Sequence, residues 1–383
     1  MPSSPTTGLS RGLAIALTWS LPLALAGCEA DTAHLTPLVW ERVTGPAANG
    51  SLLDVGAAGD FDEGATFTVS AFKDGGTYYL YYGGSGVDAP AGCPGINGTH
   101  WRVGLATSTD GLNFTKVPGA ETGGAILDVG SAGDFDSYLA YKPFVLKDGA
   151  TWRLWYNGAA DPFRCPSDTL GLSRRIGYAE SDDGITWTKM NDGPGPGGSV
   201  LPLGGAQSID EQQVGYVWVL KDGGEYKLYY SANDATNTWR VALATSSDAR
   251  TWTKVTGKQH GGSILDIGGA GTLDAACAYQ PTVVKQSDQL YRMWYRACAV
   301  PGALGGPSAG TIGYAESNDG ITWVKVPQPG AKGSALVAGA AGALDSGGLT
   351  TPAVILDDSS WDLYYAGFDT TGQYRIGLAR AAR

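Results

Sequence analysis

The chain has 383 residues, with 26 basic and 37 acidic side chains and a formal net charge of −11 at pH 7. No stretch concentrates lysine and arginine, so nucleic acid, whose phosphates require a dense cluster of cations, is excluded as an expected partner. Glycine is abundant, at 58 residues, and no helical period of apolar residues follows the N-terminal segment, which together favour an all-β fold.

The first predicted element is an export signal over residues 1–27. Arg11 precedes an apolar run that ends in Leu25-Ala26-Gly27-Cys28, and this run is too short to cross a membrane. Its last four residues resemble a bacterial lipobox, which implies cleavage before Cys28 and acylation of that cysteine. The alternative is ordinary cleavage after Ala26, because Ala24-Leu25-Ala26 fits the small-x-small rule. We expect a lipidated tether over residues 28–37 and an exported lipoprotein at the outer membrane, at the cell surface or in the periplasm, with the lipid anchor as its only membrane contact.

Five similar units follow the tether. One aspartate marks each unit at intervals of roughly 70 residues, a period typical of repeat architectures: Asp62, Asp136, Asp210, Asp274 and Asp345. Each unit then carries short runs rich in Val, Ile, Tyr and Trp, separated by turn signals such as Lys73-Asp74-Gly75, which predicts a four-stranded meander. The second run is aromatic at successive positions, as in residues 78–82, so we expect sheets that are buried on both faces.

The fifth unit ends after its third run, at residues 374–383. A matching fourth run, Trp40-Glu41-Arg42-Val43, stands before the first unit. A linear array has no reason for this arrangement, whereas a circular array needs its first and last units joined. The sequence therefore predicts a five-bladed β-propeller over residues 38–383, with four antiparallel strands per blade and the last blade closed by an N-terminal strand. We expect one domain and a monomer.

Four cysteines remain after Cys28, an even number in an exported chain, so disulfides are expected. In an antiparallel four-stranded blade, the entry to the first strand and the loop between the second and third strands lie on the same face of the ring. Cys277 and Cys298 occupy these two positions in the fourth unit, while Cys93 and Cys165 occupy the same loop in the first two units. We predict the pairs Cys277–Cys298 and Cys93–Cys165. Zinc is not expected, because CxxC spacing and nearby histidines are lacking.

Several of these features together resemble the arabinanase, levansucrase and invertase superfamily of five-bladed glycosidases, which includes glycoside hydrolase families 43 and 32. They are the N-terminal closure, an aspartate ahead of an x-P-x-V run, and an I-G-Y-A-x-S-x-D-G-I-x-W run. The resemblance implies an aspartate base or nucleophile from the first blade, a second aspartate from the second blade and a glutamate acid from the third. The corresponding candidates here are Asp62 or Glu63, Asp136, and Asp210 or Glu211.

The sequence departs from the superfamily at one position. The first acid of the superfamily stands immediately before the proline that opens the inner strand, where this chain has Thr68-Val69, Lys142-Pro143 and Gly215-Tyr216 in its first three units. None of these residues is acidic.

The five repeated aspartates also have a structural interpretation, because a residue present in every unit is suited to tying a loop to backbone donors. Glu63 and Glu211 are not repeated, which favours them as functional residues; the alternative is that both are solvated loop acids. Aromatic side chains at the loop-rich face are candidates for stacking on sugar rings, with blade packing as the alternative: Trp101, Phe163, Trp239 and Phe368.

Two hypotheses for function follow. In the first, an extracytoplasmic glycoside hydrolase-like protein processes oligo- or polysaccharide through paired carboxylates. Asp62 or Glu63 is then the base or nucleophile, Asp136 orients and tunes it, and Glu211 is the acid. In the second, a non-catalytic propeller binds glycan or protein at the loop-rich face. No cofactor is expected, apart from a structural calcium that inward aspartates could hold in the central channel, as the resemblance suggests.

Overall fold

Strands and short 3-10 turns are the regular elements of residues 37–86, 100–131, 134–159, 174–300 and 310–383, which are the residues that this computed structural model describes. They belong to one unit, Pro37–Arg383. The predicted signal segment and Cys28, Cys93, Phe163 and Cys165 lie outside the described residues. No helix within the described ranges is both long and apolar enough to cross a membrane.

The strands of the described residues form antiparallel groups of four, as the repeated runs predict. The first two groups are β2 (Ala65–Asp74), β3 (Thr77–Ser85), β4 (Trp101–Ser108) and β5 (Thr115–Val117), then β6 (Leu139–Asp148), β7 (Thr151–Ala159), β8 (Arg175–Ser181) and β9 (Thr188–Lys189). The next two are β10 (Gln213–Asp222), β11 (Glu225–Asn233), β12 (Trp239–Ser246) and β13 (Thr253–Val255), then β14 (Cys277–Ser287), β15 (Leu290–Cys298), β16 (Thr311–Ser317) and β17 (Val324–Lys325).

The last group combines the two ends of the unit. It contains β18 (Gly348–Leu356), β19 (Ser360–Phe368), β20 (Tyr374–Ala382) and β1 (Glu41–Val43). β1 pairs antiparallel with β20, with Glu41 opposite Arg380 and Val43 opposite Leu378. This register confirms the prediction that the N-terminal run supplies the fourth strand which the C-terminal unit lacks.

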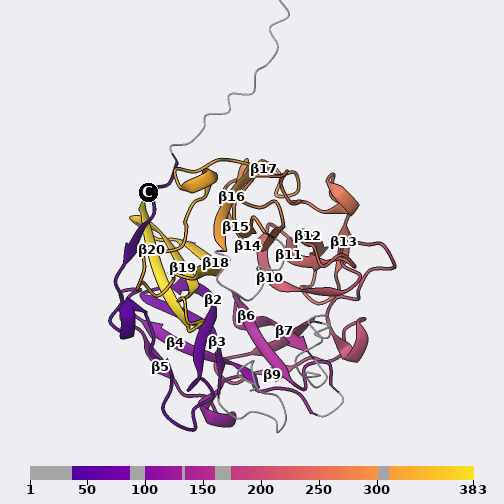
Figure 1. Cartoon of the computed structure of the whole chain (residues 1–383). Coiled ribbons are helices and arrows are strands. Elements are labelled where there is room, and N and C mark those ends of the chain that lie inside the picture. The colour runs from indigo at the N-terminus through magenta and orange to yellow at the C-terminus, as the bar shows by residue number, and fades with distance from the viewer. Residues whose placement is uncertain (1–36, 87–99, 132–133, 160–173, 301–309) are drawn as a thin grey trace, which may run out of the picture. The chain divides into compact units, whose positions relative to one another are not determined.

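Short 3-10 turns precede the next group after each fourth strand, at Ala48–Gly50, Thr122–Gly124, Pro196–Gly198, His260–Gly262 and Ala331–Gly333. Single parallel bridges, Trp101 with Leu139 and Trp239 with Cys277, join the first two groups and the third and fourth groups into two eight-stranded sheets. In Figure 1, β2, β6, β10, β14 and β18 lie towards the middle of this unit, and β5, β9, β13 and β17 lie at its periphery. We call the five central strands the inner strands.

Aromatic residues fill the space between groups from both faces of each sheet. Tyr81 and Tyr82 are adjacent in β3 and point to opposite faces, yet both are buried, and Trp155 and Tyr156 repeat this arrangement in β7. The prediction of sheets buried on both faces is therefore confirmed.

The first and last groups are also in contact. The Tyr364 hydroxyl donates to the Gly111 carbonyl oxygen at 2.9 Å, and Lys73 pairs with Asp357.

The predicted disulfide between Cys277 and Cys298 is confirmed. The two cysteines face each other across β14 and β15, with a Cα–Cα separation of 4.9 Å. The bond fastens the start of an inner strand to the end of its neighbour. The other predicted pair, Cys93 with Cys165, lies outside the described residues and stays a prediction.

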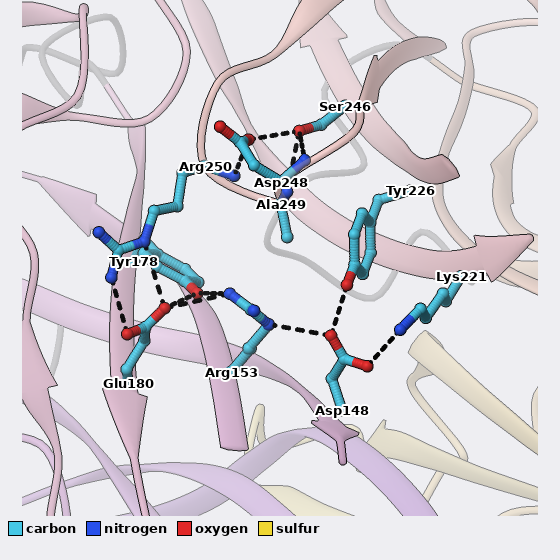
Figure 2. A network of polar contacts seen from close by, with 10 residues as sticks. All are labelled: Asp148, Arg153, Tyr178, Glu180, Lys221, Tyr226, Ser246, Asp248, Ala249 and Arg250. Atoms are coloured by element: carbon cyan, nitrogen blue, oxygen red, sulfur yellow. Dashed lines mark hydrogen bonds and ion pairs between the residues drawn. The ribbon is translucent and has the colours of Figure 1, made fainter. Parts of the chain in front are cut away.

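A network of charged side chains joins neighbouring groups at the ends of the inner strands, where the Lys-Asp-Gly turns lie. Figure 2 shows Asp148, the last residue of β6, receiving hydrogen bonds or ion pairs from Arg153, Lys221 and Tyr226. Equivalent contacts recur between other groups, and we call the set the turn network: Lys73 and Tyr78 on Asp357, Lys147 on Asp74, and Lys285 and Tyr291 on Asp222.

Candidate functional site

The five inner strands share one irregularity near their starts. The pairing register of each shifts at a β-bulge. At each bulge one non-glycine residue has a positive φ: Thr68 (46°), Lys142 (54°), Tyr216 (51°), Gln280 (55°) and Thr351 (46°). This conformation is costly for branched and bulky side chains, and bulges are used to re-aim side chains beside functional sites. Its recurrence at the same place in all five inner strands indicates a built feature.

These five bulge residues line a single pocket where the inner strands converge. The pocket opens to solvent, and the empty space around its lining residues is about 350 Å³, part of which is open solvent. Its remaining lining comes from the residues that follow each bulge: Val69, Pro143, Phe144, Val217, Trp218, Pro281 and Pro352. The pocket therefore has apolar walls and presents one variable polar side chain from each strand.

Three buried polar atoms of this pocket have no hydrogen-bond partner among the described residues: Thr68 Oγ1, Gln280 Nε2 and Thr351 Oγ1. The other end of the Gln280 amide is occupied, because its oxygen accepts from the Thr351 backbone N–H at 2.8 Å and from the Thr350 hydroxyl at 2.5 Å. Buried polar groups are normally satisfied. Unsatisfied polar groups on three of the residues that line one pocket are therefore consistent with a polar ligand or ordered water there.

Positive charge gathers beside the same pocket. The Lys142 ammonium lies 3.4 Å from the centre of the Tyr216 ring. The Arg174 guanidinium lies 5.9 Å from the same ring and donates to the Tyr141 hydroxyl and to the Gln213 side-chain oxygen, each at 2.8 Å. Within the part of the chain that the structure describes, neither Lys142 nor Arg174 forms an ion pair with a carboxylate.

The electrostatics of Lys142 and Tyr216 are coupled. Burial lowers the pKa of Lys142 to about 7, against the opposing effect of Tyr216. Burial raises the pKa of Tyr216, but the positive charges of Arg174 and Lys142 outweigh it and bring that pKa down to about 7. The pocket thus holds two adjacent groups that both exchange protons near neutral pH, a property that is concentrated at functional sites.

The repeated aspartates lie elsewhere, buried between strands. Asp62 accepts from the Tyr82 hydroxyl at 2.9 Å and pairs with Lys116 at 2.7 Å. The same pair of partners recurs in the other groups: Tyr156 and Lys189 on Asp136, Tyr230 and Lys254 on Asp210, Tyr295 and Lys325 on Asp274, and Tyr365 and Arg42 on Asp345. Each aspartate therefore links the second strand of its group to the fourth.

This arrangement agrees with the structural interpretation of the repeated aspartates and corrects one detail of it. The carboxylate partners are tyrosine and a cation rather than backbone donors. In the last group the cation is Arg42 of β1, which takes the place that lysine holds in the other four. The signal was present in the sequence, because a tyrosine in the second run and a cation in the fourth run recur together with the aspartate.

Glu63 and Glu211 occupy equivalent loop positions just ahead of β2 and β10. The Gly59 backbone N–H donates to Glu63 Oε2 at 2.7 Å, and the Gln207 backbone N–H donates to Glu211. Both glutamates are partly exposed, whereas Asp62, Asp136 and Asp210 are buried. None of these five acids lines the pocket, and their catalytic roles stay predictions.

The predicted sugar-binding aromatic residues are packed among other rings. Trp239 and Phe368 are 1% and 3% exposed; Trp239 stacks on Tyr279 and Phe368 packs on Tyr374. Trp101 is partly exposed and packs edge-on against Phe67 and Tyr141. Enclosed rings such as Trp239 present no face to a ligand in this conformation. Phe163 lies outside the described residues.

The pocket residues were not among the candidates drawn from the sequence. Thr68-Val69 and Lys142-Pro143 are the pairs that the sequence places where the superfamily has its first acid, but the expected acid drew attention away from their own polar side chains. In the third unit the expected pair was Gly215-Tyr216, whereas the structure puts Tyr216-Val217 at the equivalent position, one residue later. A further signal was the repeated pairing of a polar residue with proline, as in Gln280-Pro281 and Thr351-Pro352. As for metals, the described residues contain no group of three His, Cys, Asp or Glu side chains placed to hold an ion, and the structural calcium stays a prediction.

Comparison with known proteins places this geometry in context. No protein-family model matches the chain. It is 27% identical over 223 residues to the uncharacterized protein Rv1502 of Mycobacterium tuberculosis, a match that covers 56% of this chain and 65% of the relative. The chain thus matches slightly less than two thirds of the length of this curated relative.

Solved structures match over most of the chain. A glycoside hydrolase superimposes with a TM-score of 0.66 at 16% identity, covering 90% of this chain and 92% of the hydrolase. A β-1,2-mannobiose phosphorylase from Listeria innocua, in complex with β-1,2-mannobiose, gives a TM-score of 0.60 at 13% identity over 87% and 94% of the two chains. Other matches are an exo-1,5-α-L-arabinanase from a bovine ruminal metagenomic library, at 15% identity and a TM-score of 0.52, and a thermostable family-43 glycoside hydrolase, at 16% identity and a TM-score of 0.57. This confirms the resemblance drawn from the sequence: the chain has the all-β, propeller-like fold of these glycosidases.

Proposed function

We propose that this protein recognises and processes oligo- or polysaccharide in the manner of a glycoside hydrolase, with the pocket between the inner strands as its saccharide site. The observation that carries the proposal is the repeated bulge, which places one polar residue from each inner strand in the lining of one pocket. Five copies of a costly backbone conformation persist only where the surrounding structure maintains them, and such strain is concentrated at functional sites. The likeness in fold to glycosidases, one of them in complex with β-1,2-mannobiose, supports carbohydrate as the ligand.

The scaffold that we propose is a five-bladed propeller closed by β1. Its support is the pairing of β1 with β20 and the contact of Tyr364 with Gly111, which brings the last group against the first. A ring of this kind gives the ligand access to the starts of all five inner strands at once.

For the chemistry, we propose that Glu63 and Glu211 form the carboxyl pair. They are the candidates whose side chains are partly exposed, and they come from different groups. A second candidate function, saccharide binding without hydrolysis, is favoured by one specific observation. The residues that line the pocket include no carboxylate.

The test is a screen of the full chain against aryl glycosides and polysaccharides, with saccharide binding measured in parallel. Glu63→Gln and Glu211→Gln are compared with Glu121→Gln, a change at an exposed glutamate on a 3-10 turn. Loss of a general acid or base typically lowers turnover about 10²- to 10⁴-fold. Such a loss in either variant, with saccharide affinity retained, supports hydrolysis. Saccharide binding without turnover in the unaltered chain supports the second function, and absence of saccharide binding contradicts both.

We further propose that the protein is exported and anchored to the membrane by acylation of Cys28. The support is the Leu25-Ala26-Gly27-Cys28 run. Fractionation of cells that express Cys28→Ala checks this, and retention of that variant in the membrane fraction would count against acylation.

A further inference from the structure

We propose that the pocket binds a saccharide that carries an oxyanion, either the carboxylate of an acidic sugar or a phosphate ester, with the anion seated beside Lys142 and Arg174. This inference rests on the proposed saccharide site and names the class of its ligand. Three observations support it: the positive charge at the pocket, its hydrogen-bond donors, and the difference between its cations and other cations of the same unit, which pair with carboxylates.

The first feature is charge. Lys142 lines the pocket, and Arg174 lies against Tyr216, which lines it too. Arg296 adds a third cation, 5.5 Å from the ring of Tyr279 and 3.2 Å from the Thr350 hydroxyl oxygen. Among the described residues, no carboxylate compensates Lys142 or Arg174. Removing cations from water without a counter-charge is costly, so a site that keeps them together is suited to receive an anion.

The second feature is an excess of hydrogen-bond donors. The Gln280 amide group offers N–H, because its oxygen is already occupied by Thr350 and Thr351. In its protonated form, Lys142 can only donate. The Thr351 hydroxyl is unsatisfied and can either donate or accept. A neutral sugar hydroxyl both donates and accepts, whereas an oxyanion only accepts, so this set of groups matches an oxyanion more closely.

The third feature is the contrast between Lys142 and Arg174, which are partly exposed, and the cations that are fully buried. Arg102 pairs with Asp128 at 2.6 Å, Arg240 with Asp266 at 2.6 Å, and Lys227 with Asp222 at 2.7 Å. In a chain of net charge −11, acidic partners are plentiful. Lys142 and Arg174, which have no carboxylate partner among the described residues, therefore lie where an incoming negative group would complete the pairing.

The test is calorimetric titration of the full chain with matched ligands. An oligogalacturonate is compared with the neutral galacto-oligosaccharide of equal length, and mannose 6-phosphate with mannose. Inorganic phosphate alone forms a separate arm. We expect at least one acidic ligand to bind about tenfold or more tightly than its neutral match, the effect of one charge-assisted contact. The carboxylate and phosphate arms identify which oxyanion the pocket accepts. This comparison uses the unaltered chain, so it does not depend on how a variant folds.

A variant pair locates the anion. Lys142→Met should reduce binding of the acidic ligand about tenfold or more and bring it to the level of the neutral one. Lys147→Met, five residues along the same strand and paired with Asp74 in the turn network, should leave binding unchanged.

The outcomes separate this inference from the proposed function. Equal affinity for acidic and neutral saccharides, with no effect of Lys142→Met, would contradict the inference that the ligand carries an oxyanion. It would leave the proposed saccharide site unaffected. Binding of inorganic phosphate alone, with neither type of saccharide bound, overturns the proposed function and with it the acidic saccharide. Loss of acidic-ligand binding in Lys147→Met to the same degree as in Lys142→Met overturns the location.

Discussion

The two ends of the inner strands hold polar residues that are balanced in opposite ways. At the turn network, Asp148 is surrounded by Arg153, Lys221 and Tyr226, so each charge has a partner within the fold. At the bulge six residues earlier in the same strand, Lys142 has an aromatic ring beside it and no carboxylate among the described residues. Charges that the fold satisfies join neighbouring groups, whereas charges that it leaves uncompensated are available to a ligand.

The pKa shifts express the same difference. At the turn network, burial would raise the pKa of Asp148, but hydrogen bonds from Lys221 and Tyr226 outweigh it and hold the pKa below its usual range. At the pocket, burial lowers the pKa of Lys142; Tyr216 opposes this shift in part, and no described carboxylate does. A satisfied group thus keeps its ordinary charged state, while an uncompensated one moves towards neutrality at physiological pH.

The largest expected effect comes from removing a buried carboxylate whose hydrogen-bond and ion-pair partners lie within the fold. Asp136→Ala removes the buried carboxylate that Tyr156 and Lys189 share, and leaves their polar groups unpaired. We expect a loss of about 3 kcal/mol in the free energy of unfolding, as for other broken buried pairs, measured by denaturant titration. Asp288→Ala, at a 97% exposed side chain, is the control and should change little. A loss below about 1 kcal/mol in Asp136→Ala would show that these aspartates do not hold the groups together.

Removing an uncompensated charge should act in the opposite direction. Lys142→Met is expected to raise the free energy of unfolding by about 1–2 kcal/mol at pH 6, because an apolar side chain replaces a desolvated cation. The folded pKa of Lys142, about 7, lies below its ordinary value. The unfolded chain therefore holds more protons above pH 7, and the stabilisation by methionine should fade as pH rises from 7. Thermal unfolding of the unaltered chain and of Lys142→Met at pH 6 and pH 9 checks this. If Lys142→Met were less stable than the unaltered chain at pH 6, Lys142 would be a charge that has a partner within the fold.

Binding of an acidic saccharide should weaken as pH rises. Lys142 and Tyr216 both have a pKa of about 7, so raising pH through 7 removes a positive charge and adds a negative one. The charged or titratable groups that influence this pair are Tyr141, Arg174, Tyr279, Arg296 and Tyr374, and burial raises the pKa of Tyr374 too.

The burial-raised pKa values of Tyr141 and Tyr279 keep both neutral through this range. We expect affinity to fall about tenfold between pH 6 and pH 8, measured by calorimetry. A neutral saccharide should show no such change, and a flat profile for the acidic ligand would contradict the assignment.

The smallest expected effect lies in the turns between third and fourth strands, which Figure 2 shows in part around Ala249. Gly184 has a φ of +76°, and a Cβ there would approach the Tyr81 hydroxyl oxygen to 2.7 Å. Gly184→Ala should therefore cost about 1 kcal/mol of stability. The reverse change at the equivalent position, Ala249→Gly, is the matched control, because Ala249 already accommodates its methyl group at φ 64°. Equal and small effects at both positions would show that these turns tolerate either residue.

Much of the fold could be predicted because the repeats make it redundant. The aromatic second runs, the Lys-Asp-Gly turns and the displaced fourth run each depend on local pattern, and β1 lies beside β20 as that pattern predicted. The Cys277–Cys298 pair followed from strand order in the same way. The candidate site was harder to predict from the sequence, because an aspartate that recurs five times has the same local sequence whether it serves catalysis or structure.

The sequence by itself determined the repeat, the antiparallel meanders and the pairing of the chain's two ends, because periodicity and turn chemistry are local properties. Only the tertiary structure decided which polar side chains have a hydrogen-bond or ion-pair partner within the fold. Asp62 meets Tyr82 and Lys116 through strands that are distant along the chain. A bulge likewise rotates Lys142 and Tyr216 out of the regular alternation into a shared pocket. Whether a charge is satisfied depends on neighbours that only folding brings together.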